Sequence, residues 1–180
     1  MMAAREAPEW QVEQWLNCDE PLTLAAQRGR VVVIEAFQML CPGCVSHGLP
    51  QAARIAETFT RTDVTVVGMH CVFEHHEAQT AAALKAFMHE YRVAFPVGID
   101  SRGGSDSVPQ TMAAYRMRGT PTLVLIDRLG RRRAQYFGQV GDLQLGAEIA
   151  ALLGEGALDR TASDAAMTDP DGCGAGSCIL

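Results

Sequence analysis

The chain has 180 residues, and its 48% hydrophobic and 20% charged residues match ordinary soluble globular domains, which argues against a largely disordered protein and against a membrane protein. Its net charge of −6 argues against a nucleic-acid partner, because neutralising phosphates requires clustered Lys and Arg. No segment approaches the roughly 18 continuous apolar residues of a membrane span, so we expect no membrane partner. Residues 1–15 lack the apolar stretch of a secretory signal, and the chain is therefore expected to be cytoplasmic.

Strand and helix patterns alternate along the chain. The β-branched runs at 31–34 and 64–69 predict two buried strands, and the segment 45–59 between them has helical composition after Pro42. Further elements are expected in this order: a helix at 77–91, an extended segment at 95–99, a short helix at 112–115, strands at 122–126 and 133–137, and a helix at 143–153. This alternation predicts an α/β fold whose central, mostly parallel mixed sheet has helices on both faces.

The composition changes towards the end of the chain. We expect an N-terminal extension at 1–9, one domain at 10–154, and a flexible tail rich in Gly, Ala and Asp at 155–180. The tail carries Cys173 and Cys178, which could form an accessory dithiol delivered to the domain or belong to an inert end of the chain.

The feature that carries chemistry is the sequence Cys41-Pro42-Gly43-Cys44, between a predicted strand and a predicted helix. A cysteine at a helix N-terminus is stabilised as a thiolate by free N–H groups and the helix dipole. We therefore expect Cys41 to attack a disulfide and Cys44 to resolve the mixed disulfide. The same spacing also occurs in zinc sites, which would need two more ligands, for example Cys173 and Cys178.

Three segments resemble the thioredoxin superfamily, in particular its redoxin or thiol:disulfide interchange (TlpA-like) branch. They are the strand at 31–37 with the residues that precede it from Leu22 onward, the cysteine motif at 41–44, and the loop at 115–123. The resemblance covers residues 10–153 and implies a thioredoxin-like fold. It also implies that Pro121 is cis and faces the cysteines, and that the backbone of Thr120 pairs with an extended substrate. Without the resemblance, Pro121 would be expected to be a trans proline that opens an edge strand.

The resemblance also assigns a role to Glu35, six residues before Cys41, where thioredoxins keep a buried acid. Burial would raise its pKa and let it exchange a proton with Cys44. An exposed Glu, or one bonded to nearby backbone, is the alternative. The sequence departs from the family pattern at Leu40, which replaces a tryptophan, and at Pro50, one place later than the usual proline.

Two other functions compete with this interpretation. His70, His75 or His76 could join Cys41 and Cys44 in a copper or zinc carrier. A peroxiredoxin-like peroxidase shares the fold, but its reactive cysteine follows a threonine by three places, where this chain has Gln38. The isolated residues Cys18 and Cys71 are expected to be small buried side chains.

The sequence therefore predicts a thiol:disulfide oxidoreductase with catalytic residues Cys41, Cys44 and Glu35 and without an organic cofactor or metal. Its partners are expected to be a protein or small-molecule disulfide or thiol and a separate electron donor. If the chain is cytoplasmic, the expected direction is reduction of the substrate.

Overall fold

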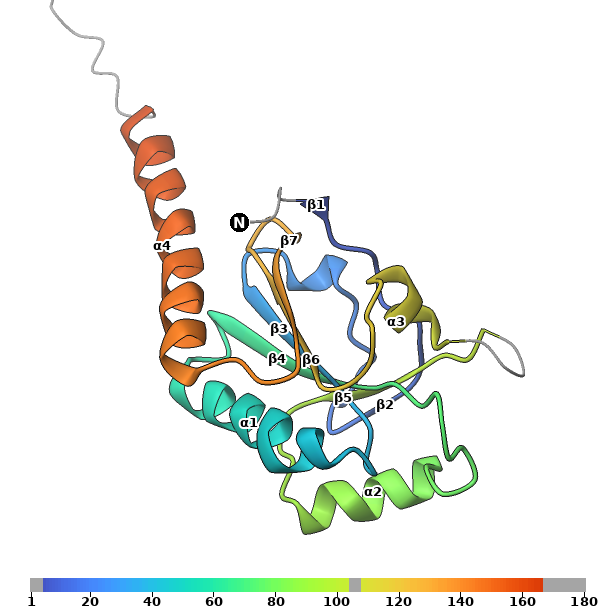
Figure 1. The fold of residues 1–180 in the computed structure, drawn as a ribbon. Helices are drawn as coiled ribbons and strands as arrows, with labels where there is room; N and C mark the ends of the chain where they lie inside the picture. The colour runs from blue at the N-terminus through green and yellow to red at the C-terminus, as the bar shows by residue number, and fades with distance from the viewer. Residues whose placement is uncertain (1–4, 104–107, 167–180) are drawn as a thin grey trace, which may run out of the picture.

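The computed structural model describes residues 5–103 and 108–166, with side chains up to residue 155. Its centre is a seven-stranded sheet in the order β1-β7-β6-β3-β4-β5-β2 (Figure 1). The strands are β1 (Arg5–Glu6), β2 (Val12–Leu16), β3 (Val31–Phe37), β4 (Val64–His70), β5 (Val97–Asp100), β6 (Thr122–Ile126) and β7 (Arg131–Phe137). The central mixed sheet predicted from the sequence is therefore present.

The pairing within the sheet differs from the expected mostly parallel arrangement. Strand β3 is parallel to β4, and β4 is parallel to β5, whereas the other four pairings between described strands are antiparallel. One cause is the tight turn between β6 and β7, where Gly130 adopts the left-handed φ of 76°. A short turn of this kind can join only antiparallel strands.

Helices cover both faces of the sheet, as predicted (Figure 1). The helical elements are η1 (Ala25–Gln27), η2 (Cys44–Gly48), α1 (Leu49–Thr58), α2 (Ala81–Glu90), α3 (Gln110–Ala114) and α4 (Asp142–Ala166). One hydrophobic core joins alternate residues of β3 to α1, α2 and α4, and the other joins the remaining β3 residues to α3 and Trp10. Strand β3 is buried on both faces, which explains its continuous apolar sequence.

The described residues on either side of the two expected domain boundaries belong to regular elements. Arg5–Glu6, within the expected N-terminal extension, pairs with β7, and the Glu9 carboxylate accepts hydrogen bonds from the N–H groups of Leu24 and Ala25. At the other end, α4 runs to Ala166 and thus into the predicted tail, since single glycines such as Gly154 cost a helix only about 1 kcal/mol each. No helix of the described residues has the length and apolarity needed to span a membrane.

Candidate active site

The cysteine motif lies where the central strand β3 ends and the next helix begins. Pro42 and Gly43 are already helical, and Cys44 opens the π-helical turn η2, which leads into α1. Both cysteines are free thiols. Cys44 is fully buried, whereas Cys41 is partly exposed at the end of the helix. The predicted difference in accessibility between the two cysteines is therefore present in the structure.

The Cys41 sulfur lies between two backbone groups. The Cys44 N–H donates a hydrogen bond to Cys41 Sγ at 3.2 Å, as expected for an unpaired N–H of the first helical turn. On the other side, the sulfur lies 3.5 Å from the Thr120 carbonyl, to which the thiol donates. The two backbone groups thus hold the sulfur from opposite sides.

The peptide bond between Thr120 and Pro121 is cis, as the resemblance implies. Pro121 packs directly against the cysteine helix, since a Cβ added to Gly43 would lie 3.2 Å from its Cδ, and one added to Gly48 would lie 3.2 Å from its Cβ. Two glycines on the facing helix therefore allow the proline loop to approach the cysteines closely.

Glu35 is buried beneath the same helix, with 1% of its surface exposed. Its carboxyl group packs against the backbone of Gly48, where an added Cβ would overlap with Oε1. Oε1 has no hydrogen-bond partner among the described residues, and burial raises the pKa of Glu35 to about 8. Glu35 is therefore buried and not on an exposed strand face, and its proton exchange with Cys44 stays a prediction.

Burial also separates the two thiols chemically. The pKa of Cys44 lies well above its ordinary value, mainly because the thiol is desolvated and also because it interacts with the neighbouring Cys41. Cys44 therefore needs a base before it can attack a sulfur atom, because only the thiolate is nucleophilic. The Glu35 carboxyl, buried against Gly48 of the same helix, is of the right type for that task.

Residues 3–134 match the AhpC/TSA family. This chain therefore belongs to the AhpC/TSA family. Among solved structures, a thioredoxin-like superfamily protein is 60% identical, with 83% of this chain and 96% of that chain covered and a TM-score of 0.80. A thiol-disulfide isomerase from Corynebacterium glutamicum is 48% identical over 82% of this chain and 96% of its own, with a TM-score of 0.77. The predicted membership of the thioredoxin superfamily is confirmed.

A curated relative, Protein DipZ of Mycobacterium bovis, is 25% identical over 127 residues. The alignment covers 69% of this chain but only 17% of DipZ. The AhpC/TSA-family chain thus spans less than a fifth of the length of the curated relatives it matches.

The late position of Pro50 in this AhpC/TSA-family chain has a local explanation. The five residues Cys44–Gly48 form a π-helical turn, which takes up one residue more than an α-helical turn, and Pro50 falls in the first turn of α1 just after it. The helical run is continuous from Pro42, so Pro50 lies inside it and removes one backbone donor directly after this wider turn. Gly48, the last residue of this turn, lies against Glu35.

Sequence reasoning missed two buried glutamines that hold the loop before Cys41. The Gln79 side-chain carbonyl accepts a hydrogen bond from the Met39 N–H at 3.0 Å, and its Nε2 donates to Gln38 Oε1 at 2.9 Å and to the Glu74 carbonyl at 2.9 Å. Both side chains are at most 4% exposed. Glutamine is usually a surface residue, so nothing in a single sequence would have singled out this pair.

The three candidate metal-binding histidines differ in burial. His70 is 1% exposed and packs at 5.2 Å from the Phe37 ring, and burial lowers its pKa to about 4, partly offset by Gln79. His75 is exposed and His76 is half-buried. No group of three or more His, Cys, Asp or Glu side chains in the described residues could hold a metal. The cysteine pair thus lacks a third ligand among them.

The remaining cysteines differ from one another. Cys71 is buried as predicted, and its thiol lies 3.4 Å from Asp100 Oδ2. Asp100 also accepts hydrogen bonds from the first N–H groups of α3, which makes the pair part of the core. Cys18 is half-exposed, and the prediction that it is buried is wrong. Cys173 and Cys178 lie outside the described residues.

Proposed function

We propose that this chain is a thiol:disulfide oxidoreductase in which Cys41 attacks and Cys44 resolves. The observation that carries the proposal is the position of the Cys41 sulfur, partly exposed and placed between the Cys44 N–H and the Thr120 carbonyl beside Pro121. An incoming disulfide can reach this sulfur, whereas Cys44 is closed to solvent. The identity to a thiol-disulfide isomerase supports the same activity.

In the first step, the Cys41 thiolate attacks one sulfur of the substrate disulfide. The substrate S–S bond breaks, a bond from Cys41 to the substrate forms, and one substrate sulfur leaves as a thiolate that takes up a proton. The backbone of Thr120 binds the segment that flanks the substrate cysteine. No organic cofactor takes part in this exchange.

In the second step, Cys44 gives its proton to Glu35, directly or through one water, and attacks Cys41 Sγ. The mixed disulfide breaks, the second substrate sulfur leaves and takes the proton from Glu35, and the Cys41–Cys44 disulfide forms. Two electrons have then moved from the protein to the substrate. A separate dithiol donor returns the protein to its reduced state by the reverse exchange.

A trapping experiment tests these roles. Cys44→Ser should accumulate a covalent mixed disulfide with a model peptide disulfide, because no resolving thiol remains, while Cys41→Ser should react with none. Mass spectrometry after acid quenching identifies the adduct and its site. Cys18→Ser is a control that should turn over like the wild type. An adduct on Cys71, or turnover by Cys41→Ser, would overturn the proposal.

A further inference from the structure

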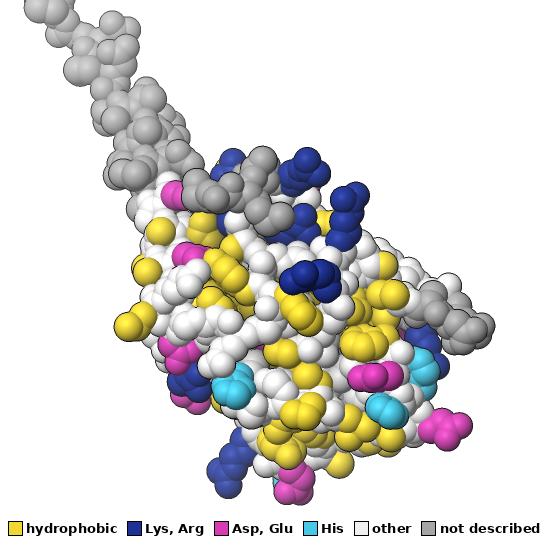
Figure 2. All heavy atoms as spheres, viewed as in Figure 1, with side chains coloured by type: hydrophobic (Ala, Val, Ile, Leu, Met, Phe, Trp, Pro, Cys, Tyr) yellow, Lys and Arg dark blue, Asp and Glu magenta, His cyan; other side chains and the backbone are white. Residues whose placement is uncertain are grey.

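A basic hollow lies on the surface beside the proline loop. Four arginines from β1, β7 and the segment after α3 line a hollow of about 470 Å³, and the aromatic ring of Phe137 lies at its edge. We call this hollow the arginine groove; its arginines are Arg5, Arg116, Arg118 and Arg132. Figure 2 shows basic side chains gathered at the end of the visible face where Figure 1 places β1 and β7.

The charges of this groove are not compensated within the described residues. None of its four arginines forms an ion pair with a described acid, whereas Arg54, Arg128 and Arg133 each pair with an Asp or Glu. Arg132 instead donates to two neutral acceptors, the Tyr115 carbonyl at 3.0 Å and Gln135 Oε1 at 3.1 Å. The groove therefore concentrates positive charge on a protein whose net charge is −6.

Two of these charges also oppose each other in the sheet. Arg5 and Arg132 are directly paired residues of the antiparallel strands β1 and β7, so their side chains project from the same face. Like charges in such a pair destabilise a sheet. An anion bound between the two side chains would remove that repulsion.

A series of contacts connects the arginine groove to the reactive sulfur of Cys41. The Arg118 guanidinium lies 5.0 Å from the centre of the Phe137 ring, which is half exposed. Phe137 packs on the backbone of Gly119, where an added Cβ would lie 2.9 Å from the ring. The next residue is Thr120, whose carbonyl lies 3.5 Å from Cys41 Sγ. A chain that runs along the groove therefore continues towards Cys41.

We propose that the arginine groove binds an acidic polypeptide segment that flanks the reactive cysteine of the redox partner. The inference rests on the proposed function and adds that the redox partner carries acidic residues next to its reactive cysteine. Four cations spread along a groove match several carboxylates of an extended chain better than one small anion, and Phe137 offers an apolar contact next to them. Complementary charge at the edge of an interface mainly raises the rate of association.

The test compares two disulfide-linked peptides that differ only in their flanking residues, four Glu in one and four Gln in the other. The measured quantity is the ratio of their second-order rates of reduction by the reduced full-length protein at low ionic strength. We expect the acidic peptide to react at least about tenfold faster. Adding 1 M NaCl should bring the ratio close to one, because the Debye length falls to about 3 Å.

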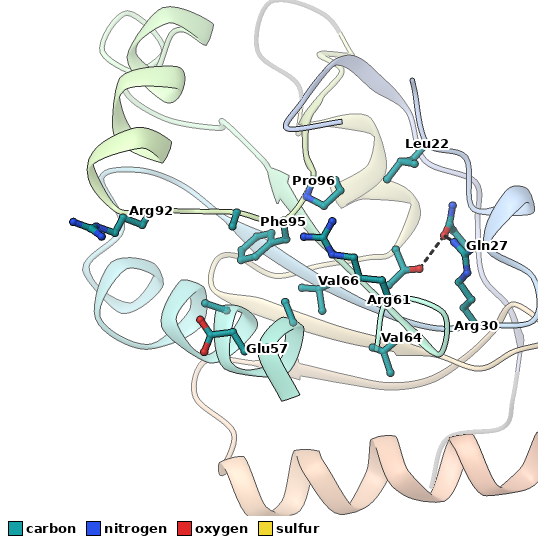
Figure 3. A pocket seen from close by; sticks show the side chains of 14 residues that line it. Leu22, Gln27, Arg30, Glu57, Arg61, Val64, Val66, Arg92, Phe95 and Pro96 are labelled. Atoms are coloured by element: carbon teal, nitrogen blue, oxygen red, sulfur yellow. Dashed lines mark hydrogen bonds between the residues drawn. The ribbon is translucent and has the colours of Figure 1, made fainter. Parts of the chain in front are cut away.

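The decisive variant is Arg5→Gln, Arg116→Gln, Arg118→Gln, which leaves Arg132 in place because it holds the Tyr115 carbonyl. Its ratio should fall to about one. A matched control makes the same charge change at Arg30, Arg61 and Arg92, three arginines that line a separate cavity of about 270 Å³ at the start of β4 (Figure 3). This cavity lies at the far end of the parallel strands from Cys41, and the control should keep the wild-type ratio.

The possible outcomes distinguish a failure of the arginine groove from a failure of the proposed oxidoreductase function. Equal rates for the two peptides in the wild type, or equal loss of the preference in both triple variants, would overturn the arginine groove as a binding site. Reduction of neither peptide would instead refute the proposed function, and the inference with it. If the variant failed to fold, equal rates for the two peptides with the wild type at low ionic strength would still overturn the inference.

Discussion

Glu35 allows a direct test of the active-site structure, because burial destabilises the ionised form of its carboxyl group. Burial raises the pKa of Glu35 from its ordinary value of 4.5 to about 8 in the folded protein. In the unfolded chain the carboxyl group is exposed to water and ionises near 4.5. Between these two values the folded state holds one proton more than the unfolded state, so stability must fall as the pH rises.

The isosteric variant Glu35→Gln cannot ionise and should escape this loss. Below pH 4.5 the wild type and the variant should have similar free energies of unfolding, because both side chains are then neutral. Each pH unit in the interval contributes about 1.36 kcal/mol. The variant should therefore be more stable than the wild type by about 3 kcal/mol at pH 7 and by about 5 kcal/mol at pH 9.

The assay is urea unfolding followed by circular dichroism at pH 5, 7 and 9, with a reductant that keeps all thiols free. Glu57→Gln, at an exposed position of α1, is the matched control and should follow the pH dependence of the wild type. A stability difference between Glu35→Gln and the wild type that stays constant from pH 5 to pH 9 would refute the buried acid. In turnover, the variant should resolve mixed disulfides more slowly, because it cannot accept the Cys44 proton.

Other predictions follow from the same contacts. Iodoacetamide should label Cys41 well before the fully buried Cys44, as peptide mapping will show, and the reverse order would contradict the assigned roles. Gly48→Ala should lower the free energy of unfolding by about 1–3 kcal/mol, because its Cβ overlaps with Glu35 Oε1, and adding Glu35→Ala should restore much of the loss. Burial lowers the pKa of His70 from 6.5 to about 4. As the pH falls through that interval, the free energy of unfolding of the wild type should therefore drop by about 3 kcal/mol relative to that of His70→Leu. Stability curves of the two proteins that run parallel over this pH range would contradict the buried neutral imidazole.

Much of the fold could be predicted from the sequence because its signals are local. Strand β6 was predicted with its observed bounds, and the buried runs of β3 and β4 follow from their unbroken β-branched residues. The cysteine motif between a strand and a helix identified the reactive pair, since its spacing and position follow directly from the order of residues. Thr80 was not recognised as the N-cap of α2, so the predicted start of that helix was four residues early.

Only the tertiary structure decided how distant residues meet around that pair. The contact of Glu35 with Gly48, the Thr120 carbonyl beside Cys41 Sγ, and the bond from Met39 to Gln79 each join segments that a local pattern cannot relate. The same holds for β1, which is only two residues long and exists because it pairs with β7. Burial, hydrogen bonding and charge at these positions depend on packing between elements, whereas periodicity and motif spacing are properties of the chain itself.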